Sequence, residues 1–269
     1  MDEWRFLKLE VDDAFMNMAV DEAILSARIA NMVPNTVRFY GWKPSAVSIG
    51  RFQEVFNEIH VENCKKHGVD IVRRITGGGS VYHDHVGEIT YSVVVRESDL
   101  GFKDVASTYS IICKGLIEAA KTLGITADFN PGDPKKCPNV TINRRKISGS
   151  AQSRRKRTLL QHGTFLLDTD LEKMFTFLRV PWAETCMEVI PIAEKRLTSV
   201  REELGTSVPP EEACQALVQG FQETFETRFT DGKLTNHEQE LAKKLCGGKF
   251  ATDRWTFEGK CPNRACVLP

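Results

Sequence analysis

A chain of 269 residues can bury a large core, and a composition of 41% hydrophobic and 27% charged residues excludes a disordered or fibrous protein. Lys plus Arg and Asp plus Glu both number 36, so the zero net charge excludes a whole-molecule field that would attract nucleic acid or anionic membrane. The first ten residues carry charges and no stretch reaches ~18 uninterrupted apolar residues, so we expect a cytoplasmic protein without signal peptide or membrane helix.

The predicted elements begin with a short strand and an amphipathic helix. Asp12 or Asp13 caps this helix, whose apolar residues recur at helical spacing. The next two strands flank a turn-rich segment, 41–45, of the kind that joins a hairpin. In chain order, the pattern predicts a strand over 4–10, a helix over 16–27, strands over 36–40 and 46–50, a helix over 61–66, a strand over 69–73, a loop at 77–79 and a strand over 88–95.

A long amphipathic helix over 104–123, closed by Gly124, opens the second half of the chain. Because strands dominate the first two thirds and helices the last, we predict an α+β fold with mixed β-sheets flanked by helices. We expect one domain over 1–269, with a sheet-rich core at 1–170 and a mainly helical completion at 171–269. The remaining predictions are strands over 140–142, 146–147 and 159–167, an exposed turn at 154–157, and helices over 171–178, 210–227 and 238–245.

The segment 73–84 concentrates two arginines, three successive glycines and a His-Asp pair. Glycines lack side chains, so a ligand's phosphate or acyl chain can approach the main-chain amides closely. The segment fits neither the Walker pattern nor the dinucleotide pattern, and a flexible turn beside a stabilising Arg-Asp pair is the alternative. The binding candidates are Arg73, Arg74, Thr76, Gly77, Gly78, Gly79, Ser80, Val81, His83 and Asp84.

A second segment, 146–152, holds a lysine among small residues after a short strand. In a cleft beside the arginines, the Lys146 ammonium would bind a carboxylate or acyl phosphate and stabilise an oxyanion, so Lys146 is the catalytic candidate; a solvated, inert lysine is the alternative. A strand histidine, His162, is interpreted as a structural hydrogen-bonding residue or, functionally, as part of an acyl pocket. The further binding candidates are Ser148, Gly149, Ala151, His162, Gly163 and Thr164.

Together these segments resemble the lipoate-protein ligase A family, which belongs to the superfamily of biotin and lipoate protein ligases and octanoyltransferases. Residues 73–84 are similar to its RRxxGGGxVxHD signature, 146–151 to KxSGxA and 161–164 to HHGT, in the same order. The resemblance implies a catalytic domain of the biotin/lipoate-protein-ligase-like fold. It also implies that Lys146 contacts the activated acyl group, and that Arg73, Arg74 and the glycine loop surround lipoyl-AMP.

The resemblance further implies a ligase that activates lipoate with ATP and Mg²⁺ to lipoyl-AMP. It would then pass lipoyl to a lysine of an acidic lipoyl carrier domain, of the 2-oxoacid dehydrogenase acyltransferase or glycine cleavage H protein type. The metal would come with the nucleotide and not from a protein cage. Phe39, Val81 and Phe165 are expected to help line the lipoyl slot.

Two features depart from the full-length ligases. They carry a further C-terminal accessory domain, for which this chain has no room before Pro269, so we expect a separate accessory subunit. Gln161, in place of the family's first His, and the segment 88–92 are closer to octanoyltransferases of the same fold, which need no ATP.

Octanoyltransferases take octanoyl from acyl carrier protein through a cysteine thioester, with a lysine assisting. Cys137 would be that nucleophile. We favour a loop cysteine without a role, because the transferase cysteine is expected further upstream of the lysine. Gly79 stands where the transferases usually carry an arginine, which favours the ligase.

Two other features of the sequence bear on partners and metals. The eight cysteines form no CxxC pair, so neither a zinc site nor a disulfide framework is expected. A group of basic residues suggests a third hypothesis, in which the chain is a non-catalytic binding module. The absence of aromatic residues between them argues against nucleic acid as the ligand. We expect these residues to face an acidic carrier: Arg144, Arg145, Lys146, Arg154, Arg155, Lys156 and Arg157.

Overall fold

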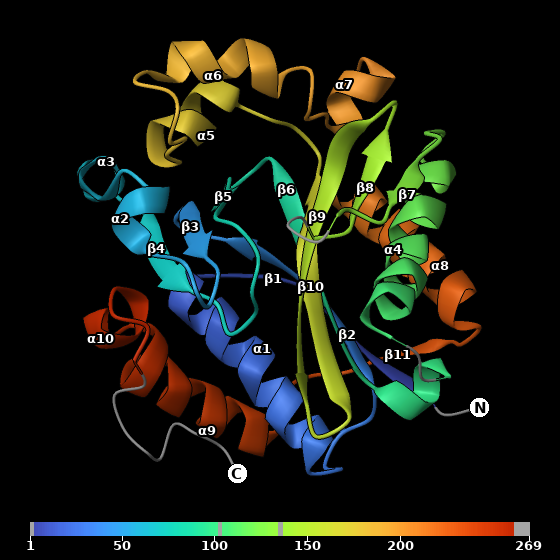
Figure 1. Cartoon of the computed structure of the whole chain (residues 1–269). Helices are drawn as coiled ribbons and strands as arrows, with labels where there is room; N and C mark the ends of the chain where they lie inside the picture. Colours follow the sequence, from blue (N-terminus) through green and yellow to red (C-terminus); the bar gives the residue numbers. More distant parts are fainter. Residues whose placement is uncertain (1–2, 102–103, 134–136, 261–269) are drawn as a thin grey trace.

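The computed structural model describes residues 3–101, 104–133 and 137–260, in which strands form two β-sheets between layers of helices (Figure 1). The strands are β1 (Trp4–Asp12), β2 (Thr36–Trp42), β3 (Ala46–Ile49), β4 (Asp70–Arg73), β5 (Val81–His83), β6 (Glu88–Arg96), β7 (Asp128–Asn130), β8 (Asn139–Ile142), β9 (Arg145–Arg155), β10 (Thr158–Leu166) and β11 (Phe229–Asp231). Among these described strands, eight form one sheet in the order β11-β1-β2-β6-β10-β9-β8-β7, and three form another in the order β4-β3-β5. Both sheets mix parallel and antiparallel pairs, which confirms the predicted α+β class.

Aspartates cap the two long helices of the first half of the chain. The Asp13 carboxylate accepts the backbone N–H of Met16 at the start of α1 (Ala14–Ile29), and Asp104 accepts that of Ser107 at the start of α4 (Val105–Thr122). Gly124, with φ of +82°, follows α4 in the left-handed conformation that ends many helices. The other helices are α2 (Val55–Glu58), α3 (Val61–Lys66), α5 (Leu171–Phe177), α6 (Cys186–Ala193), α7 (Val200–Leu204), α8 (Pro210–Phe225), α9 (Asn236–Leu245) and α10 (Asp253–Thr256), with a 3₁₀ turn at Glu97–Leu100 and a π-helical turn at Cys246–Phe250.

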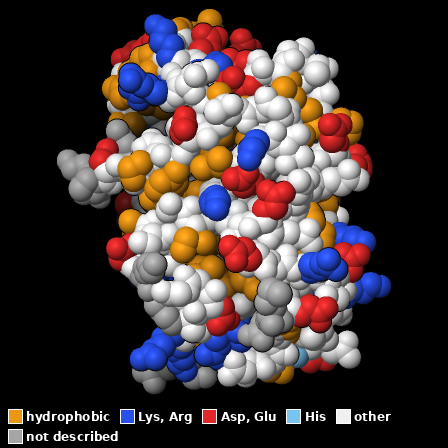
Figure 2. All heavy atoms as spheres, turned by 90° about the vertical axis from the view of Figure 1, so that its right-hand side faces the viewer, with side chains coloured by type: hydrophobic (Ala, Val, Ile, Leu, Met, Phe, Trp, Pro, Cys, Tyr) orange, Lys and Arg blue, Asp and Glu red, His pale blue; other side chains and the backbone are white. Residues whose placement is uncertain are grey.

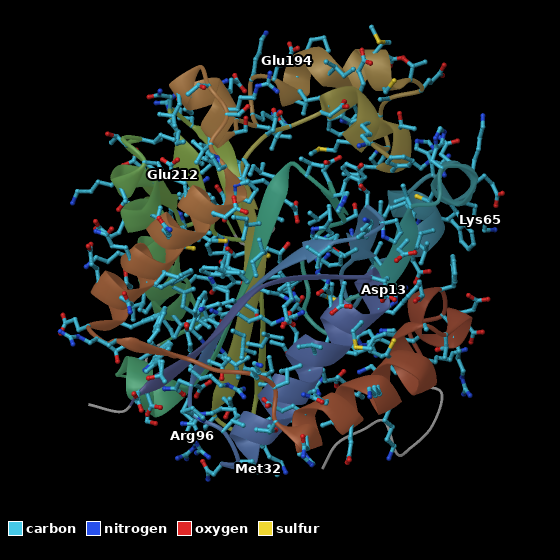
Figure 3. The ribbon with its side chains drawn as sticks, turned by 180° about the vertical axis from the view of Figure 1, so that it is seen from behind. Asp13, Met32, Lys65, Arg96, Glu194 and Glu212 are labelled. Atoms are coloured by element: carbon cyan, nitrogen blue, oxygen red, sulfur yellow. The ribbon has the colours of Figure 1, made fainter. Side chains whose placement is uncertain are left out.

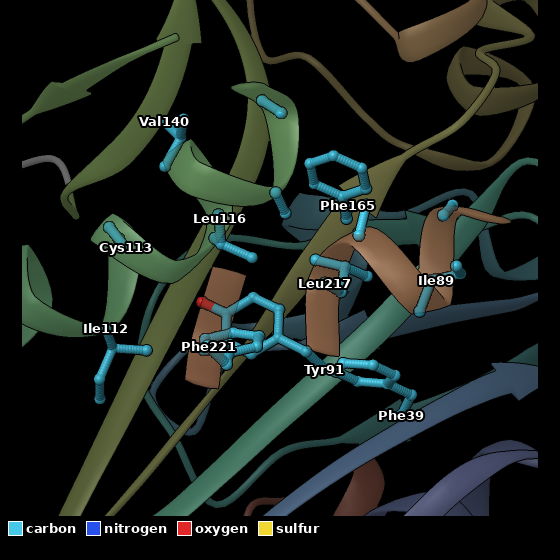
Figure 4. Close-up of a cluster of buried hydrophobic side chains, with 14 of the residues drawn as sticks. Phe39, Ile89, Tyr91, Ile112, Cys113, Leu116, Val140, Phe165, Leu217 and Phe221 are labelled. Carbon is cyan, nitrogen blue, oxygen red and sulfur yellow. The ribbon is translucent and has the colours of Figure 1, made fainter. Parts of the chain in front are cut away.

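The large sheet lies between two pairs of helices. Helices α4 and α8 cover one face, and α1 and α9 cover the other, as the views from the front and from behind agree (Figures 1 and 3). The alternation of side chains along β6 separates the two cores. Tyr91 packs under α8 with its ring 5.5 Å from that of Phe221 (Figure 4), whereas Val94 belongs to the core beneath α1. In the part of the chain that is described, no helix is both long and apolar enough to cross a bilayer.

The predicted hairpin over 36–50 is wrong. Strand β2 is paired on both of its edges, parallel to β1 and antiparallel to β6, so β3 cannot add to it. Strand β3 instead pairs with β4 and β5 in the small sheet. The turn-rich segment therefore carries the chain from one sheet to the other.

Strand β9 is longer than predicted and contains half of the expected turn. It runs to Arg155 because β10 pairs with it from Ser150 onward. Only Lys156 and Arg157, with φ of 46° and 58°, form the two-residue turn between these strands. The strands β5, β7 and β11 and the helices α2, α6, α7 and α10 were not predicted. All except α6 have three to five residues, which is too short to show a period, and α6 contains Pro191, a residue that usually ends a helix.

Candidate active site

A cavity of about 470 Å³ opens between the small sheet and the strands β9 and β10 of the large sheet. Polar and apolar residues share its wall, which suits a ligand with a polar reacting end and an apolar tail. Its described lining residues are Met18, Tyr40, Trp42, Ser48, Arg74, Gly78, Gly79, Ser80, Val81, His83, Thr90, Cys137, Pro138, Asn139, Lys146, Gly149, Ser150, Ala151, His162, Gly163 and Thr164.

A β-bulge places Lys146 on the cavity side of β9. On β8, Val140 pairs with Ser148 and the next residue, Thr141, pairs with Lys146. Ile147 is therefore an extra residue on β9 that has no partner on β8. A bulge reverses the alternation of side chains beyond it. Lys146 therefore faces the same cavity as Gly149, although the two positions differ by an odd number of residues.

The Lys146 amine is free to react. Among the described residues it makes no hydrogen bond or ion pair, and Gly149 leaves it space, since an added Cβ there would lie 3.3 Å from Lys146 Nζ. Burial lowers the pKa of Lys146, and negative charge on Cys137 partly opposes that shift. An amine of this kind is more often uncharged near neutral pH than an exposed lysine, so it can accept a proton.

The segment 194–199 supports the backbone of Lys146. The Lys146 N–H donates to the Arg196 carbonyl at 2.7 Å, and the Thr198 N–H donates to the Lys146 carbonyl at 3.0 Å. Through these bonds the segment 194–199 becomes a second hydrogen-bonding partner of β9 at this end, in addition to β8. The helical part of the chain thus positions the candidate catalytic residue.

Arg74 holds the glycine loop and has no donor left for a ligand. Its Nη1 donates to the carbonyl and hydroxyl of Ser48, its Nη2 to the carbonyls of Gly77 and Gly79, and its Nε to the Thr76 hydroxyl. A guanidinium has five N–H donors, so these contacts use all of them. Burial lowers the pKa of Arg74, to about 10, and the group stays charged at pH 7.

Arg73 lies outside the cavity lining and is bound to backbone carbonyls. Its Nε donates to the carbonyls of Trp255 and Thr256, and its Nη1 donates to those of Gly50, Arg51 and Gln53, at 2.8 to 3.1 Å. It therefore ties α10 to the small sheet. Neither arginine of the pair offers a guanidinium to a triphosphate in the cavity.

Both cavity histidines are held by hydrogen bonds. His162 Nδ1 lies 2.9 Å from Asp21, and its Nε2 lies 2.8 Å from the Thr76 hydroxyl. Burial lowers the pKa of His162 and outweighs the effect of Asp21. Burial would raise the pKa of Asp21, but the hydrogen bond from His162 and the charge of Arg38 lower it. The pair is therefore an uncharged imidazole donating to a carboxylate, which matches the structural interpretation of His162.

His83 belongs to a second chain of hydrogen bonds. Its Nε2 lies 2.7 Å from the Ser48 hydroxyl and its Nδ1 lies 2.7 Å from Glu88. The Trp42 ring stacks on the imidazole at 3.9 Å, and its N–H donates to the hydroxyl of Thr90. With both histidines engaged, the Lys146 amine and a thiol are the amine and thiol groups among the described lining residues.

That thiol belongs to Cys137, at the cavity wall beside the glycine loop. A Cβ added at Gly78 would lie 3.7 Å from the Cys137 sulfur, 3.7 Å from the Ala151 methyl and 3.5 Å from Arg74 Nη2. Of the cysteines that the structure describes, Cys137 alone is exposed. The sequence favoured a loop cysteine without a role, because the transferase cysteine was expected further upstream of the lysine. The structure places the Cys137 thiol at the cavity, which spacing along the chain could not show.

The structure brings most of the expected site residues to one cavity but not all. Thr76 is hydrogen-bonded to His162 and does not line the cavity. Asp84 forms an ion pair with Lys173, also outside the lining. Phe39 and Phe165 are buried in the core under α8 (Figure 4). Of the three residues expected in the acyl slot, Val81 lines the cavity. The residues outside its lining are Arg73, Thr76, Gly77, Asp84 and Ser148, and the lining residues that the sequence did not suggest are Met18, Tyr40, Trp42, Ser48, Thr90, Pro138, Asn139 and Ser150.

The expected basic surface is divided between the two ends of β9. Arg145 pairs with Glu202 and Glu203 at one end, while Arg154 pairs with Glu97 and Arg155 with Glu22 toward the other, about 33 Å away along an extended strand. The β9–β10 turn lies beside Arg96, at the end of the molecule opposite Glu194 (Figure 3). Lys and Arg gather at the lower edge of the face in Figure 2, without forming one continuous ridge.

Gly163→Ala is expected to damage the cavity and the fold together. An added Cβ would lie 2.2 Å from the Gly149 carbonyl oxygen, so β9 and β10 must shift where they flank Lys146. Overpacking of this kind costs about 1–3 kcal/mol, which urea denaturation measures. Gly247→Ala is the matched control, because nothing lies within 4 Å of its added Cβ. If the free energy of unfolding of Gly163→Ala equals that of the wild type, the strands accommodate the added methyl group without cost and the prediction is wrong.

Sequence relatives and solved structures agree on the family and differ in their stated activities. Three of the relatives are proteins named octanoyltransferase LipM. Those from Kyrpidia tusciae and Brevibacillus brevis are 37% and 35% identical to this chain, each over 96% of it and 99% of its own length. The protein from Bacillus subtilis is 31% identical, over 95% of this chain and 98% of its own length. A bipartite lipoate protein ligase from Thermoplasma acidophilum has a TM-score of 0.83 at 29% identity, covering 100% of both chains. A lipoate-protein ligase A bound with ATP has the same TM-score and identity, over 96% of this chain and 100% of its own.

These relatives correct the expected activity and cofactors. The sequence favoured an ATP-dependent lipoate ligase with Mg²⁺ and lipoate or lipoyl-AMP, yet the relatives that match nearly the whole chain are named octanoyltransferases. That expectation is wrong. It relied on Arg73 and Arg74, which are bound to the protein itself, and on Gly79, where an added Cβ would meet nothing within 4 Å. Packing therefore does not require glycine at that position.

The catalytic family itself is established by the length and order of the match. A sequence model of the lipoyl protein ligase A/B catalytic domain matches residues 13–222, which include the glycine loop, Lys146 and His162. The solved ligases share the fold over at least 96% of the chain. The protein is therefore an enzyme of the lipoyl protein ligase A/B catalytic domain family.

Proposed function

We propose that this enzyme is an octanoyltransferase, which moves an octanoyl group from acyl carrier protein to a lysine of a lipoyl carrier domain. The observation that carries the proposal is the presence at one cavity of the Cys137 thiol and of the Lys146 amine, which has no partner among the described residues. Both arginines of the 73–74 pair are bound to other parts of the protein. The octanoyltransferase relatives support the same activity. A thioester donor is already activated, so ATP is not required.

The first step forms an acyl-enzyme. The Cys137 thiol gives its proton to the uncharged Lys146 amine, and the thiolate attacks the thioester carbonyl of the octanoyl carrier protein. The bond between octanoyl and the carrier sulfur breaks as the bond to Cys137 forms. The Lys146 ammonium then returns the proton to the departing carrier thiolate. The lowered pKa of Lys146 supports this role, because a proton acceptor near neutral pH must be partly uncharged.

The second step passes the octanoyl group to the acceptor. The amine of the target lysine attacks the Cys137 thioester and gives a proton to Lys146, and Cys137 leaves as a thiolate. Cys137 then takes that proton from Lys146. The net reaction converts one thioester and one amine into one thiol and one amide, and it restores the enzyme.

The acceptor is proposed to be an acidic lipoyl domain, of the 2-oxoacid dehydrogenase acyltransferase or glycine cleavage H protein type. The solved bipartite ligase is described together with its E2 lipoyl domain, which supports a partner of this class. The cytoplasmic location and the single-domain organisation stay predictions. The accessory subunit was expected only for adenylation, and a transferase reaction has no step that calls for it.

A comparison of donors tests the proposed function. The purified chain is incubated with a lipoyl domain and either octanoyl carrier protein or octanoate plus Mg-ATP, and the mass of the domain is followed. We expect modification from the carrier protein alone. Without the acceptor, the enzyme itself should gain one octanoyl group that hydroxylamine removes. Modification from octanoate plus ATP, with none from the carrier protein, would overturn the proposal.

A further inference from the structure

Three exposed cations lie around the backbone of Lys146, which lines the cavity. Arg144 is in the turn between β8 and β9, two residues before Lys146, so their Cα atoms are within about 7 Å of each other. Lys195 and Arg196 belong to the segment that bridges to β9, where the Lys146 N–H donates to the Arg196 carbonyl at 2.7 Å. None of the three side chains makes an ion pair with a described residue.

The acidic groups beside these cations do not neutralise them. Both glutamates of α7 are held by Arg145. In the described segments 143–146 and 194–203, Glu194 is the one carboxylate without an ion pair, against three such exposed cations. The surface beside Lys146 therefore keeps positive charge for an acidic partner.

The basic residues at the other end of β9 are too far from the cavity to share a partner's contact there. Lys156 and Arg157 form the turn between β9 and β10, and both are exposed without an ion pair to a described residue. The length of β9 places this turn more than about 30 Å from Arg144. Figure 3 shows the two ends, one marked by Glu194 and the other by Arg96, beside the β9–β10 turn.

The position of the three cations favours the acceptor of the proposed reaction over its donor. The attacking amine belongs to a lysine, whose Nζ lies only about 6 Å from its own Cα. The folded body of the acceptor must therefore come against the rim of the cavity for the amine to reach an octanoyl group on Cys137. An acyl carrier protein holds its thioester on a long flexible arm, so its body can stay farther from Lys146.

We infer that Arg144, Lys195 and Arg196 form a docking surface for the acidic lipoyl domain that accepts the octanoyl group. Cations at the rim of an interface pair with carboxylates of the partner and speed the encounter of the two proteins. This inference rests on the proposed function, which supplies an acidic lipoyl domain as the acceptor.

Charge reversal tests the docking surface without requiring transfer. The double variant Arg144→Glu, Lys195→Glu is titrated with an unmodified lipoyl domain by isothermal titration calorimetry at low salt. Binding should weaken by roughly 10-fold, because each change replaces an attraction with a repulsion. The difference from the wild type should shrink as salt is added, since exposed charges are screened. Arg196 is unchanged, so its carbonyl still holds the backbone of Lys146.

The double variant Lys156→Glu, Arg157→Glu is the matched control, because it also reverses one lysine and one arginine. Arg144 and Arg157 each occupy the second position of a two-residue turn, with φ of 68° and 58°, so the two changes make similar demands on the backbone. The control should bind the lipoyl domain as the wild type does. Equal weakening in both double variants, or none in Arg144→Glu, Lys195→Glu, would overturn the inference.

A separate measurement distinguishes the acceptor from the donor. Octanoylation of Cys137 by octanoyl carrier protein is followed in the same variants. A loss confined to this step, with binding of the lipoyl domain intact, would assign the surface to the donor and overturn the inference. The expected loss of binding in a chain that never gains an octanoyl group would support the docking surface and overturn the proposed function.

Discussion

Cys137→Ala is expected to abolish octanoyl transfer, with a loss of at least about 10³-fold. Without the sulfur no thioester can form, and direct attack by the acceptor amine on the carrier thioester lacks the covalent intermediate that divides the reaction into two easier steps. Transfer is measured as the gain of mass by a lipoyl domain, with octanoyl carrier protein as the donor. The same variant should also fail to gain an octanoyl group itself.

The loss should reflect chemistry and not folding. Cys137 is exposed, so its replacement removes little packing, and the unfolding midpoint in urea should not move. Cys214→Ala on α8 is the matched control, because Cys214 lies outside the cavity lining. Full transfer activity in Cys137→Ala would place the nucleophile elsewhere or remove the covalent step.

Lys146→Met is expected to slow transfer by roughly 10² to 10⁴-fold, the usual contribution of a positioned acid or base. The loss should be visible in the second step alone, when isolated octanoyl-enzyme is mixed with a lipoyl domain. Starting from the acyl-enzyme removes the ionisation of the Cys137 thiol from the measurement. Methionine fills similar space without an ionisable group, and the backbone bonds of residue 146 to Arg196 and Thr198 remain.

The pH dependence of this step should identify Lys146 as the base. An amine accepts a proton only when uncharged, so the rate in the wild-type enzyme should rise as pH rises toward the pKa of Lys146, which lies below 10.5. In Lys146→Met that rise should disappear. Lys121→Met, a change of an exposed lysine on α4 that pairs with Glu118, should keep the wild-type profile. A persistent rise in Lys146→Met would assign the base to another group.

Local sequence determined most of the regular structure and part of the cavity wall. Capping aspartates mark the starts of α1 and α4, and apolar residues at helical spacing mark their buried faces, because these signals act within a few turns of the chain. The glycine loop and Lys146 also meet at one cavity as expected. That expectation came from motifs whose order and residue types are typical of one catalytic family.

The partners of the charged groups could not be predicted from the motifs. A sequence segment with two arginines indicates cationic charge but does not say which acceptors lie nearby. The acceptors of Arg73 come from Gly50 to Gln53 and from Trp255 and Thr256, which are distant in the chain. Because Arg73 is bound to those carbonyls through Nε and Nη1 and lies outside the cavity lining, it is not placed to bind a phosphate there, and the octanoyltransferase relatives overturn the expectation of ATP.

The sequence by itself determined which residues form the strands, the long helices and the glycine loop, because periodicity, capping and backbone freedom are local properties. Only the tertiary structure decided that β3 leaves the large sheet, since both edges of β2 are already paired. It also decided that the bulge at Ile147 turns Lys146 and Gly149 to the same side, and that Cys137 lies at the cavity wall beside Gly78. These features depend on pairing between distant segments, which no local pattern records.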